Sequence, residues 1–127
     1  MLASIQKFKK AEEYLSPYKG VYMPEAKLRK LIQEAGLEAV PRPKGIPENF
    51  RVKVADKYSG IVYMHPEHET TSIRVMFGKP HSPWPAQQQA YVVVTKDGHL
   101  YDKFGQIHAS EKSPAVHIPL EEFQLQW

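Results

Sequence analysis

The chain has 127 residues, of which 42% are hydrophobic, and its formal net charge is +3 at neutral pH. This length is that of one ordinary domain, and the hydrophobic content excludes a disordered chain. Because the chain has no cysteine, it cannot hold a disulfide or a thiolate metal site. No apolar run approaches the roughly 18 residues of a membrane span, and the N-terminus lacks the long apolar core of a signal peptide. The small positive excess permits a polyanionic partner without requiring one.

Two helices are expected in the first 40 residues. Apolar side chains recur at near-helical spacing between residues 2 and 15, and the Ser16-Pro17 pair should end that helix. The second helix follows Pro24, because proline is tolerated in the first turn, and runs through EAKLRKLIQEAGL. Gly36 is its candidate C-terminal cap.

A proline-rich loop, PRPKGIPEN at 41–49, separates this helical part (1–40) from a β-rich remainder at 50–127. The remainder contains five strand-like segments, which are FRVKVAD, GIVYMH, SIRVMF, AYVVVT and HLYDKFG. Asp97-Gly98 joins the last two as a hairpin turn, and VHIPLEEF closes the chain as a short edge strand or a docked tail. We therefore expect a single α+β domain over residues 1–127, with the N-terminal helices packed on an antiparallel β-sheet meander of at least four strands.

The two long loops are expected to differ in mobility. The loop at 78–89 is tied to two core-like strands, and Trp84 is its expected anchor on the sheet. We therefore expect the loop at 41–49 to be the more mobile one.

The segment IRVMFGKPHSPWPAQQQAYVVV, residues 73–94, places a stiff polar loop between two core-like strands. Its prolines restrict the backbone, and a stiff loop can hold polar side chains in place. Histidine can transfer protons near pH 7, while arginine and lysine can stabilise charge on a phosphate. Trp84 and Tyr91 can stack on a base. These are the parts of a metal-independent ribonuclease site. The alternative is that the loop is scaffold, and that Arg74 is a solvated strand residue.

The other histidines allow two interpretations each. HPEH places His65 and His68 three residues apart, a spacing that supplies two metal ligands on a helix. Here the segment follows a strand and contains proline, so a polar turn is the favoured interpretation, and neither a metal site nor a cofactor is expected. His108 falls in an expected turn. His117 lies between apolar neighbours, where a hydrogen-bonded structural histidine is more common than a catalytic one.

Three segments carry a resemblance to a known family: IRVMFGKPHSPWPAQQQAYV, DGHLYDKFGQIH and SPAVHIPLEEF. In this order they resemble the C-terminal effector domains of bacterial Rhs, contact-dependent-inhibition and related polymorphic toxins. The resemblance covers residues 60–123, about half of the chain, and Phe77 departs from it by standing where a proline is expected. The matching positions are Arg74, Gly78, Pro80, Ser82, Pro83, Gln88, Tyr91 and His117.

The resemblance implies a small ribonuclease of the barnase, colicin and RelE-like type, with helices packed on a curved antiparallel sheet. The implied activity is metal-independent cleavage of RNA, with transfer RNA as one candidate substrate, and the implied inhibitor is a cognate, acidic immunity protein. Such a domain is delivered by a secreted or surface toxin and acts in the target-cell cytoplasm, whereas a standalone protein would be cytoplasmic.

The candidate site follows from the loop and the resemblance together. We assign catalysis to Arg74, His81 and His117. Substrate binding is assigned to Lys79, Ser82, Trp84, Gln88 and Tyr91. Two alternatives stay open, a noncatalytic interaction module that keeps the toxin fold and a metal-dependent DNase. The DNase is the weaker of the two, because the candidate metal ligands are few and scattered.

Overall fold

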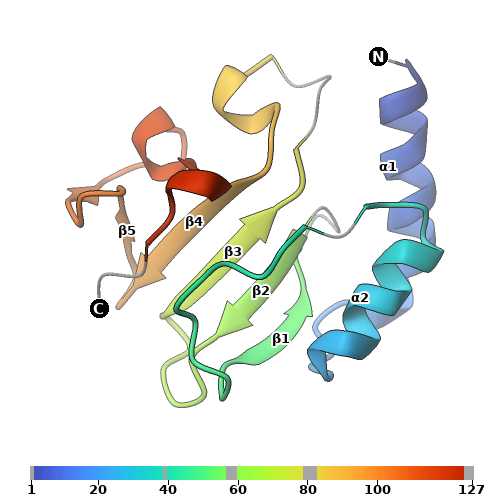
Figure 1. Cartoon of the computed structure of the whole chain (residues 1–127), viewed down its shortest axis with the longest axis horizontal. Helices are drawn as coiled ribbons and strands as arrows, with labels where there is room; N and C mark the ends of the chain where they lie inside the picture. Colours follow the sequence, from blue (N-terminus) through green and yellow to red (C-terminus); the bar gives the residue numbers. More distant parts are fainter. Residues whose placement is uncertain (1, 39, 57–59, 79–82, 125–127) are drawn as a thin grey trace.

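The computed structural model describes residues 2–38, 40–56, 60–78 and 83–124. Two N-terminal helices lie at one end of an antiparallel sheet, and the C-terminal segments lie at the other end (Figure 1). The sheet has the strand order β1-β2-β3-β4-β5-β6, and β7 pairs with β4. The expected α+β class is confirmed. The strands are β1 (Arg51–Val54), β2 (Gly60–Met64), β3 (Ser72–Met76), β4 (Tyr91–Lys96), β5 (His99–Tyr101), β6 (Ile107–His108) and β7 (Ile118–Pro119).

Both helices begin and end where the sequence signals stand. Helix α1 (Leu2–Leu15) runs into a 3₁₀ turn at Ser16–Tyr18, and α2 (Glu25–Glu34) begins directly after Pro24. Gly36 ends α2 with a φ of 90°, a left-handed conformation that favours glycine. None of the helices in the described part of the chain is long and apolar enough to cross a bilayer.

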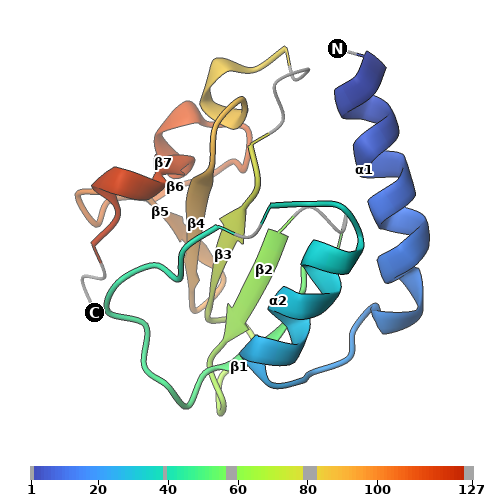
Figure 2. The same cartoon turned by 45° about the vertical axis from the view of Figure 1, so that its right-hand side comes forward.

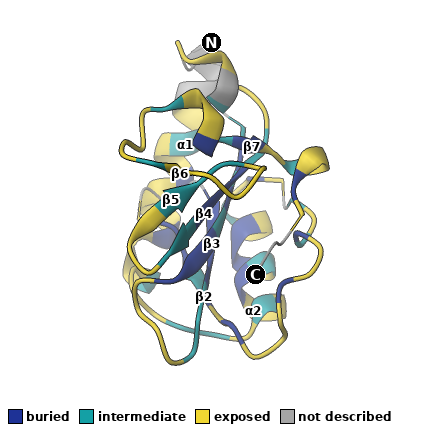
Figure 3. Ribbon diagram, turned by 90° about the vertical axis from the view of Figure 1, so that its left-hand side faces the viewer, coloured by how far each residue is buried: buried dark blue, intermediate teal, exposed yellow. Residues whose placement is uncertain are grey.

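The core lies between the helices and one face of the sheet. Alternate strand residues such as Val52, Tyr63, Ile73 and Val92 point into it, and α2 contributes Leu28, Leu31 and Ile32 from its inner face. In Figure 3 the buried residues gather along the central strands, while the connecting loops are exposed. The intervening strand residues therefore occupy the opposite face of the sheet, and Arg74 is one of them.

Two expected connections are confirmed in detail. Asp97 and Gly98 have φ values of 52° and 82°, as a two-residue type I′ turn requires, and they join β4 to β5. The closing segment forms the short strand β7, which pairs antiparallel with the start of β4. One short strand was not expected, because His108 lies in β6 rather than in a turn.

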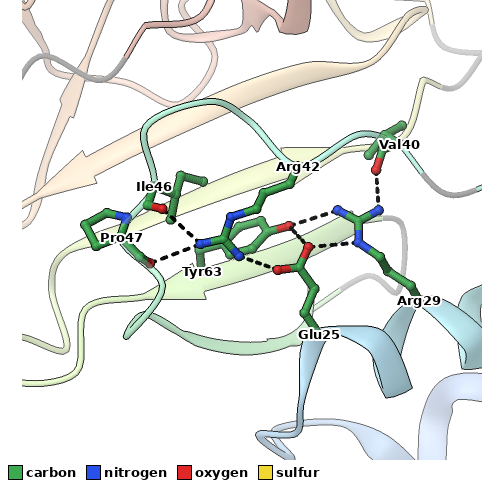
Figure 4. A network of polar contacts seen from close by, with 7 residues as sticks. All are labelled: Glu25, Arg29, Val40, Arg42, Ile46, Pro47 and Tyr63. Carbon is green, nitrogen blue, oxygen red and sulfur yellow. Dashed lines mark hydrogen bonds and ion pairs between the residues drawn. The ribbon is translucent and has the colours of Figure 1, made fainter.

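A polar network fastens the proline-rich loop to the core (Figure 4). Glu25 of α2 accepts hydrogen bonds from Arg29 at 2.8 Å and from the Tyr63 hydroxyl at 3.0 Å, and it is paired with Arg42 of the loop. Arg42 also donates to the carbonyls of Ile46 and Pro47 at 2.9 and 3.0 Å. The loop is therefore held to α2 and β2 by one shared carboxylate.

The charges in this network depend on burial and on hydrogen bonding. Burial alone would raise the pKa of Glu25, but hydrogen bonds from Arg29, Tyr63 and Arg42 outweigh it and lower that pKa. Burial raises the pKa of Tyr63 to about 12. The carboxylate is thus ionised and the phenol is neutral at physiological pH.

These contacts bear on the mobility expected of the two long loops. Ile46 is buried and Arg42 makes several bonds, so the loop at 41–49 is anchored at more than its ends. Trp84 is 60% exposed, and its expected role as the anchor of the loop at 78–89 stays a prediction. The relative mobility of the two loops stays a prediction.

Candidate functional site

A groove of about 1390 Å³ lies between segments that are far apart in the sequence. Its walls are the proline-rich loop at 41–45, the segment at 88–90, the hairpin turn at 102–104 and the C-terminal segment at 114–124. The views in Figures 1 and 2 place the C-terminal segment beside β4 and β5, away from α1. The charged residues that line the groove are Arg42, Lys44, Lys103, Asp102, Glu121 and Glu122, so its charge is mixed.

His117 lies on the wall of this groove, directly after the 3₁₀ turn at Pro114–Val116. Its Nδ1 atom is 2.9 Å from the carbonyl oxygen of Ser113. Because a carbonyl oxygen can only accept, Nδ1 carries the proton and donates. In the neutral ring, Nε2 then carries the lone pair, and the Gln87 amide nitrogen lies 3.4 Å from it. The contacts of His117 therefore identify Nε2 as the proton-accepting nitrogen of the neutral ring.

Tyr91, the first residue of β4, supports the His117 ring. The two ring centroids are 5.0 Å apart in an edge-to-face arrangement. Pairing of Tyr91 with Pro119 in β7 brings the C-terminal segment to this position. Burial raises the pKa of the Tyr91 hydroxyl, an effect that the positive charge of Arg74 partly opposes. The Tyr91 hydroxyl is therefore protonated at neutral pH and available as a hydrogen-bond donor.

Arg74 lies in the middle of β3, opposite Val62 on one side and Val93 on the other. Its neighbours Ile73 and Val75 are buried in the core, so Arg74 occupies the outer face of the sheet. It is half-buried and forms no ion pair with a carboxylate among the described residues. Arg74 is not part of the groove lining, and its electrostatic effect on Tyr91 is what connects it to His117.

The remaining expected site residues divide into two groups. Lys79, His81 and Ser82 fall in the segment 79–82, outside the described residues. Gln88 is exposed and lines the groove, and Trp84 stands exposed on the same loop. The structure thus brings together Tyr91 and His117, with Arg74 near Tyr91 and Gln88 on the groove wall.

The two ends of the loop at 78–89 lie close together, backbone against backbone. A Cβ atom on Gly78 would lie 2.6 Å from the Cα atom of Gln89 and 2.7 Å from the carbonyl oxygen of Gln88. Only glycine leaves room for the two ends of the loop to come so close. Gly78 therefore helps to place Gln88 and Gln89 on the groove wall.

Sequence reasoning missed a second polar group next to His117. Asp102 accepts a hydrogen bond from His108 Nε2 at 2.8 Å, and the Ser113 hydroxyl lies 3.4 Å from His108 Nδ1. The hydrogen bond from His108, followed by backbone bonds from Gln106 and Phe104, lowers the pKa of Asp102. A usable signal was present in DKFGQIH, because Asp102 and Gly105 mark a turn that returns the chain toward Asp102.

His65 and His68 form a polar turn. Their ring centroids are 4.5 Å apart, and His65 Nδ1 accepts a hydrogen bond from the backbone N–H of Glu67 at 3.0 Å. Across the residues that the structure describes, no three histidine, aspartate or glutamate side chains are grouped so that they could hold a metal ion.

Comparison with known proteins adds no relative. No family model matches the chain, and no curated protein or solved structure is similar enough to count as a match.

Proposed function

We propose that this chain is a metal-independent endoribonuclease of the polymorphic-toxin effector class. Its substrate is RNA, with transfer RNA as one candidate, and it acts in the cytoplasm of a target cell after delivery by a secreted or surface toxin. One observation carries the proposal. His117 stands on the wall of a groove, and its hydrogen bond to the Ser113 carbonyl leaves Nε2 as a base.

The proposed reaction needs no group beyond protein side chains and RNA. His117 Nε2 takes the proton of a ribose 2′-hydroxyl, and the 2′-oxygen attacks the adjacent phosphorus. The bond from phosphorus to the 5′-oxygen breaks. His81 protonates that oxygen, which leaves as a 5′-hydroxyl, and the other product ends in a 2′,3′-cyclic phosphate. Arg74 and Lys79 stabilise the additional negative charge on the phosphate oxygens in the transition state.

Substrate binding is assigned to the residues around this base. The neutral Tyr91 hydroxyl donates to a phosphate oxygen, which fits the raised pKa of Tyr91. Trp84, at 60% exposure, provides a ring on which an unpaired base can stack. Gln88 and Ser82 complete the polar contacts to the RNA.

An acidic immunity protein is the proposed inhibitor. The net charge of +3 suits such a partner, and electrostatic attraction would speed its association. One observation favours the noncatalytic alternative. The groove carries carboxylates as well as cations, and prolines 41, 43, 85, 114 and 119 line it, a composition that also suits a protein ligand.

Cleavage of total RNA in the presence of EDTA tests the proposal. We expect the wild-type protein to produce fragments that end in a cyclic phosphate, and His117→Gln to abolish them. His99→Gln is the matched control, because His99 is an exposed histidine on β5 and should be dispensable. Cleavage that requires added Mg²⁺ would instead show a metal-dependent nuclease. No cleavage under either condition would leave the interaction module.

A further inference from the structure

Asp102, His108 and Ser113 form a chain of contacts that ends at the histidine proposed as the base. His108 Nε2 lies 2.8 Å from Asp102 Oδ2, and His108 Nδ1 lies 3.4 Å from the Ser113 hydroxyl. The carbonyl of the same serine holds His117 Nδ1 at 2.9 Å. Ser113 therefore contacts one histidine through its side chain and the other through its backbone.

The side chain of Ser113 does not play its usual local role. Ser113 precedes the 3₁₀ turn at Pro114–Val116, a position where a serine hydroxyl commonly accepts a hydrogen bond from a backbone N–H of the first turn. Here it makes no such bond, and it lies against His108 instead. The direction of the hydroxyl is thus explained by His108 and not by helix capping.

The chemistry of each group sets which one donates and which one accepts in this series of hydrogen bonds. The ionised Asp102 side chain can only accept, and its Oδ1 atom already accepts the N–H groups of Phe104 and Gln106 at 2.9 Å each. His108 must therefore donate from Nε2, which in its neutral ring leaves Nδ1 to accept the Ser113 hydroxyl proton. Each group has one consistent role from Asp102 to His117.

We propose that Asp102, His108 and Ser113 are positioning residues for His117, an inference that rests on the ribonuclease function proposed above. A neutral histidine exists as two tautomers, and only the Nδ1–H form leaves Nε2 as the base beside Gln87. The Ser113 carbonyl selects that form. It is itself held by the N–H of Val116 at 3.2 Å and, through the serine hydroxyl, by His108.

The turn that contains Asp102, between β5 and β6, is itself held by backbone hydrogen bonds. Asp102 exchanges backbone hydrogen bonds within the turn, with its N–H donating to Gln106 and its carbonyl accepting from Gly105. Lys103 in the same turn is paired with Glu122 at 2.6 Å, across the groove wall. The turn and the C-terminal segment are therefore connected on both sides of His117, so that a displacement of one is transmitted to the other.

Nitrogen chemical shifts of the His117 ring test the proposal without any substrate. In ¹⁵N-labelled wild-type protein at pH 8, we expect the two ring nitrogens to show the Nδ1–H pattern. Ser113→Ala should shift them toward a mixture of tautomers, whereas Ser113→Thr, which restores a hydroxyl, should keep the wild-type pattern. Ser110→Ala is the matched control, because the Ser110 hydroxyl accepts a hydrogen bond from the backbone N–H of Lys112 in its own turn.

A second readout separates positioning from mere folding. Ser113→Ala should lower kcat about tenfold with KM nearly unchanged, the lower end of what loss of an orienting partner costs a functional histidine. His108→Phe, which removes both contacts of the ring, should shift the His117 pattern in the same way if Ser113→Ala does not fold. Unchanged His117 shifts in both folded variants would overturn the proposal, whether or not the wild type cleaves RNA. A wild-type protein that keeps the Nδ1–H pattern but never cleaves RNA would instead count against the proposed function alone.

Discussion

At the scale of single residues, His117 shows why neighbours in space decide what a histidine does. The apolar residues beside it in the sequence favour a structural role, and its contact with the Ser113 carbonyl is the kind of hydrogen bond such a role implies. The same bond, however, leaves Nε2 on the groove wall as the ring nitrogen with the lone pair, 3.4 Å from the Gln87 amide nitrogen. Tyr91 lies next to both residues, because its ring packs against His117, and burial raises the pKa of its hydroxyl while the positive charge of Arg74 partly opposes that rise.

Replacement of Arg74 by alanine is expected to reduce RNA cleavage about a hundredfold, or ~2.7 kcal/mol of transition-state stabilisation. Thermal stability should change little, because Arg74 lies on the outer face of the sheet. Lys27→Ala is the matched control, since Lys27 is an exposed cation on α2 and should keep near-normal activity. Ultraviolet titration gives an independent measurement. Loss of the Arg74 charge should raise the pKa of Tyr91 further, and an unchanged Tyr91 titration would contradict the proximity inferred here.

At the scale of elements, helices and long strands were predictable from local patterns, but the loops that build the groove were not. The second helix has its own start and stop signals in Pro24 and Gly36, and the β4–β5 hairpin is encoded by Asp97-Gly98. By contrast, the proline-rich loop is held by Glu25, which precedes it by 16 or more residues. The composition predicted a mobile loop, because a proline-rich segment gives no sign of a contact with a carboxylate elsewhere in the sequence. A local pattern cannot show a contact that only the fold creates.

Glu25→Gln tests the network that holds this loop. We expect a loss of about 1–2 kcal/mol in the free energy of unfolding at pH 7, because two arginines lose their shared carboxylate. Hydrogen exchange in the loop at 41–49 should quicken, while exchange in β3 and β4 should not. The exposed Glu38, changed to glutamine, is the control. Equal exchange rates in the two variants would show that the carboxylate does not anchor the loop.

The same network predicts a pH dependence. The pKa of Glu25 is lower in the folded protein than its ordinary value of 4.5, so its contribution to stability is fully present above that value. It is lost as the pH falls through the folded pKa. Chemical unfolding from pH 7 to pH 3 should therefore show the difference between wild type and Glu25→Gln shrinking below pH 4.5. A difference that grows on acidification would reverse the sign and refute the argument.

At the scale of the whole molecule, the change from helical to alternating apolar spacing was enough to predict an α+β fold, because both periods depend only on neighbouring residues. These periods were not enough to predict the site. Tyr91 meets His117 only because β7 pairs with the start of β4, across a gap of more than 20 residues, and two-residue strands leave almost no sequence pattern. The net charge likewise did not predict where the charges lie. A net charge of +3 did not reveal that the groove is mixed in charge while Arg51, Lys53 and Arg74 lie on the outer face of the sheet.

Those cations give the last prediction. Arg51 stacks on Tyr22 with its guanidinium carbon 3.7 Å from the ring centroid, Lys53 lies beside it, and neither forms an ion pair with a described carboxylate. If RNA crosses this face on its way to Arg74, each cation that contacts a phosphate adds about 0.7 to the slope of log affinity against log salt. Binding of a 2′-O-methylated RNA, which cannot be cleaved, isolates this term. Replacement of both cations by glutamine should flatten the slope by about 1.4. The same change at Lys27 and Lys30, two exposed lysines of α2, should leave the slope near the wild-type value. Equal flattening in both double variants would mean that the RNA is attracted by net charge alone and has no preferred path over the sheet.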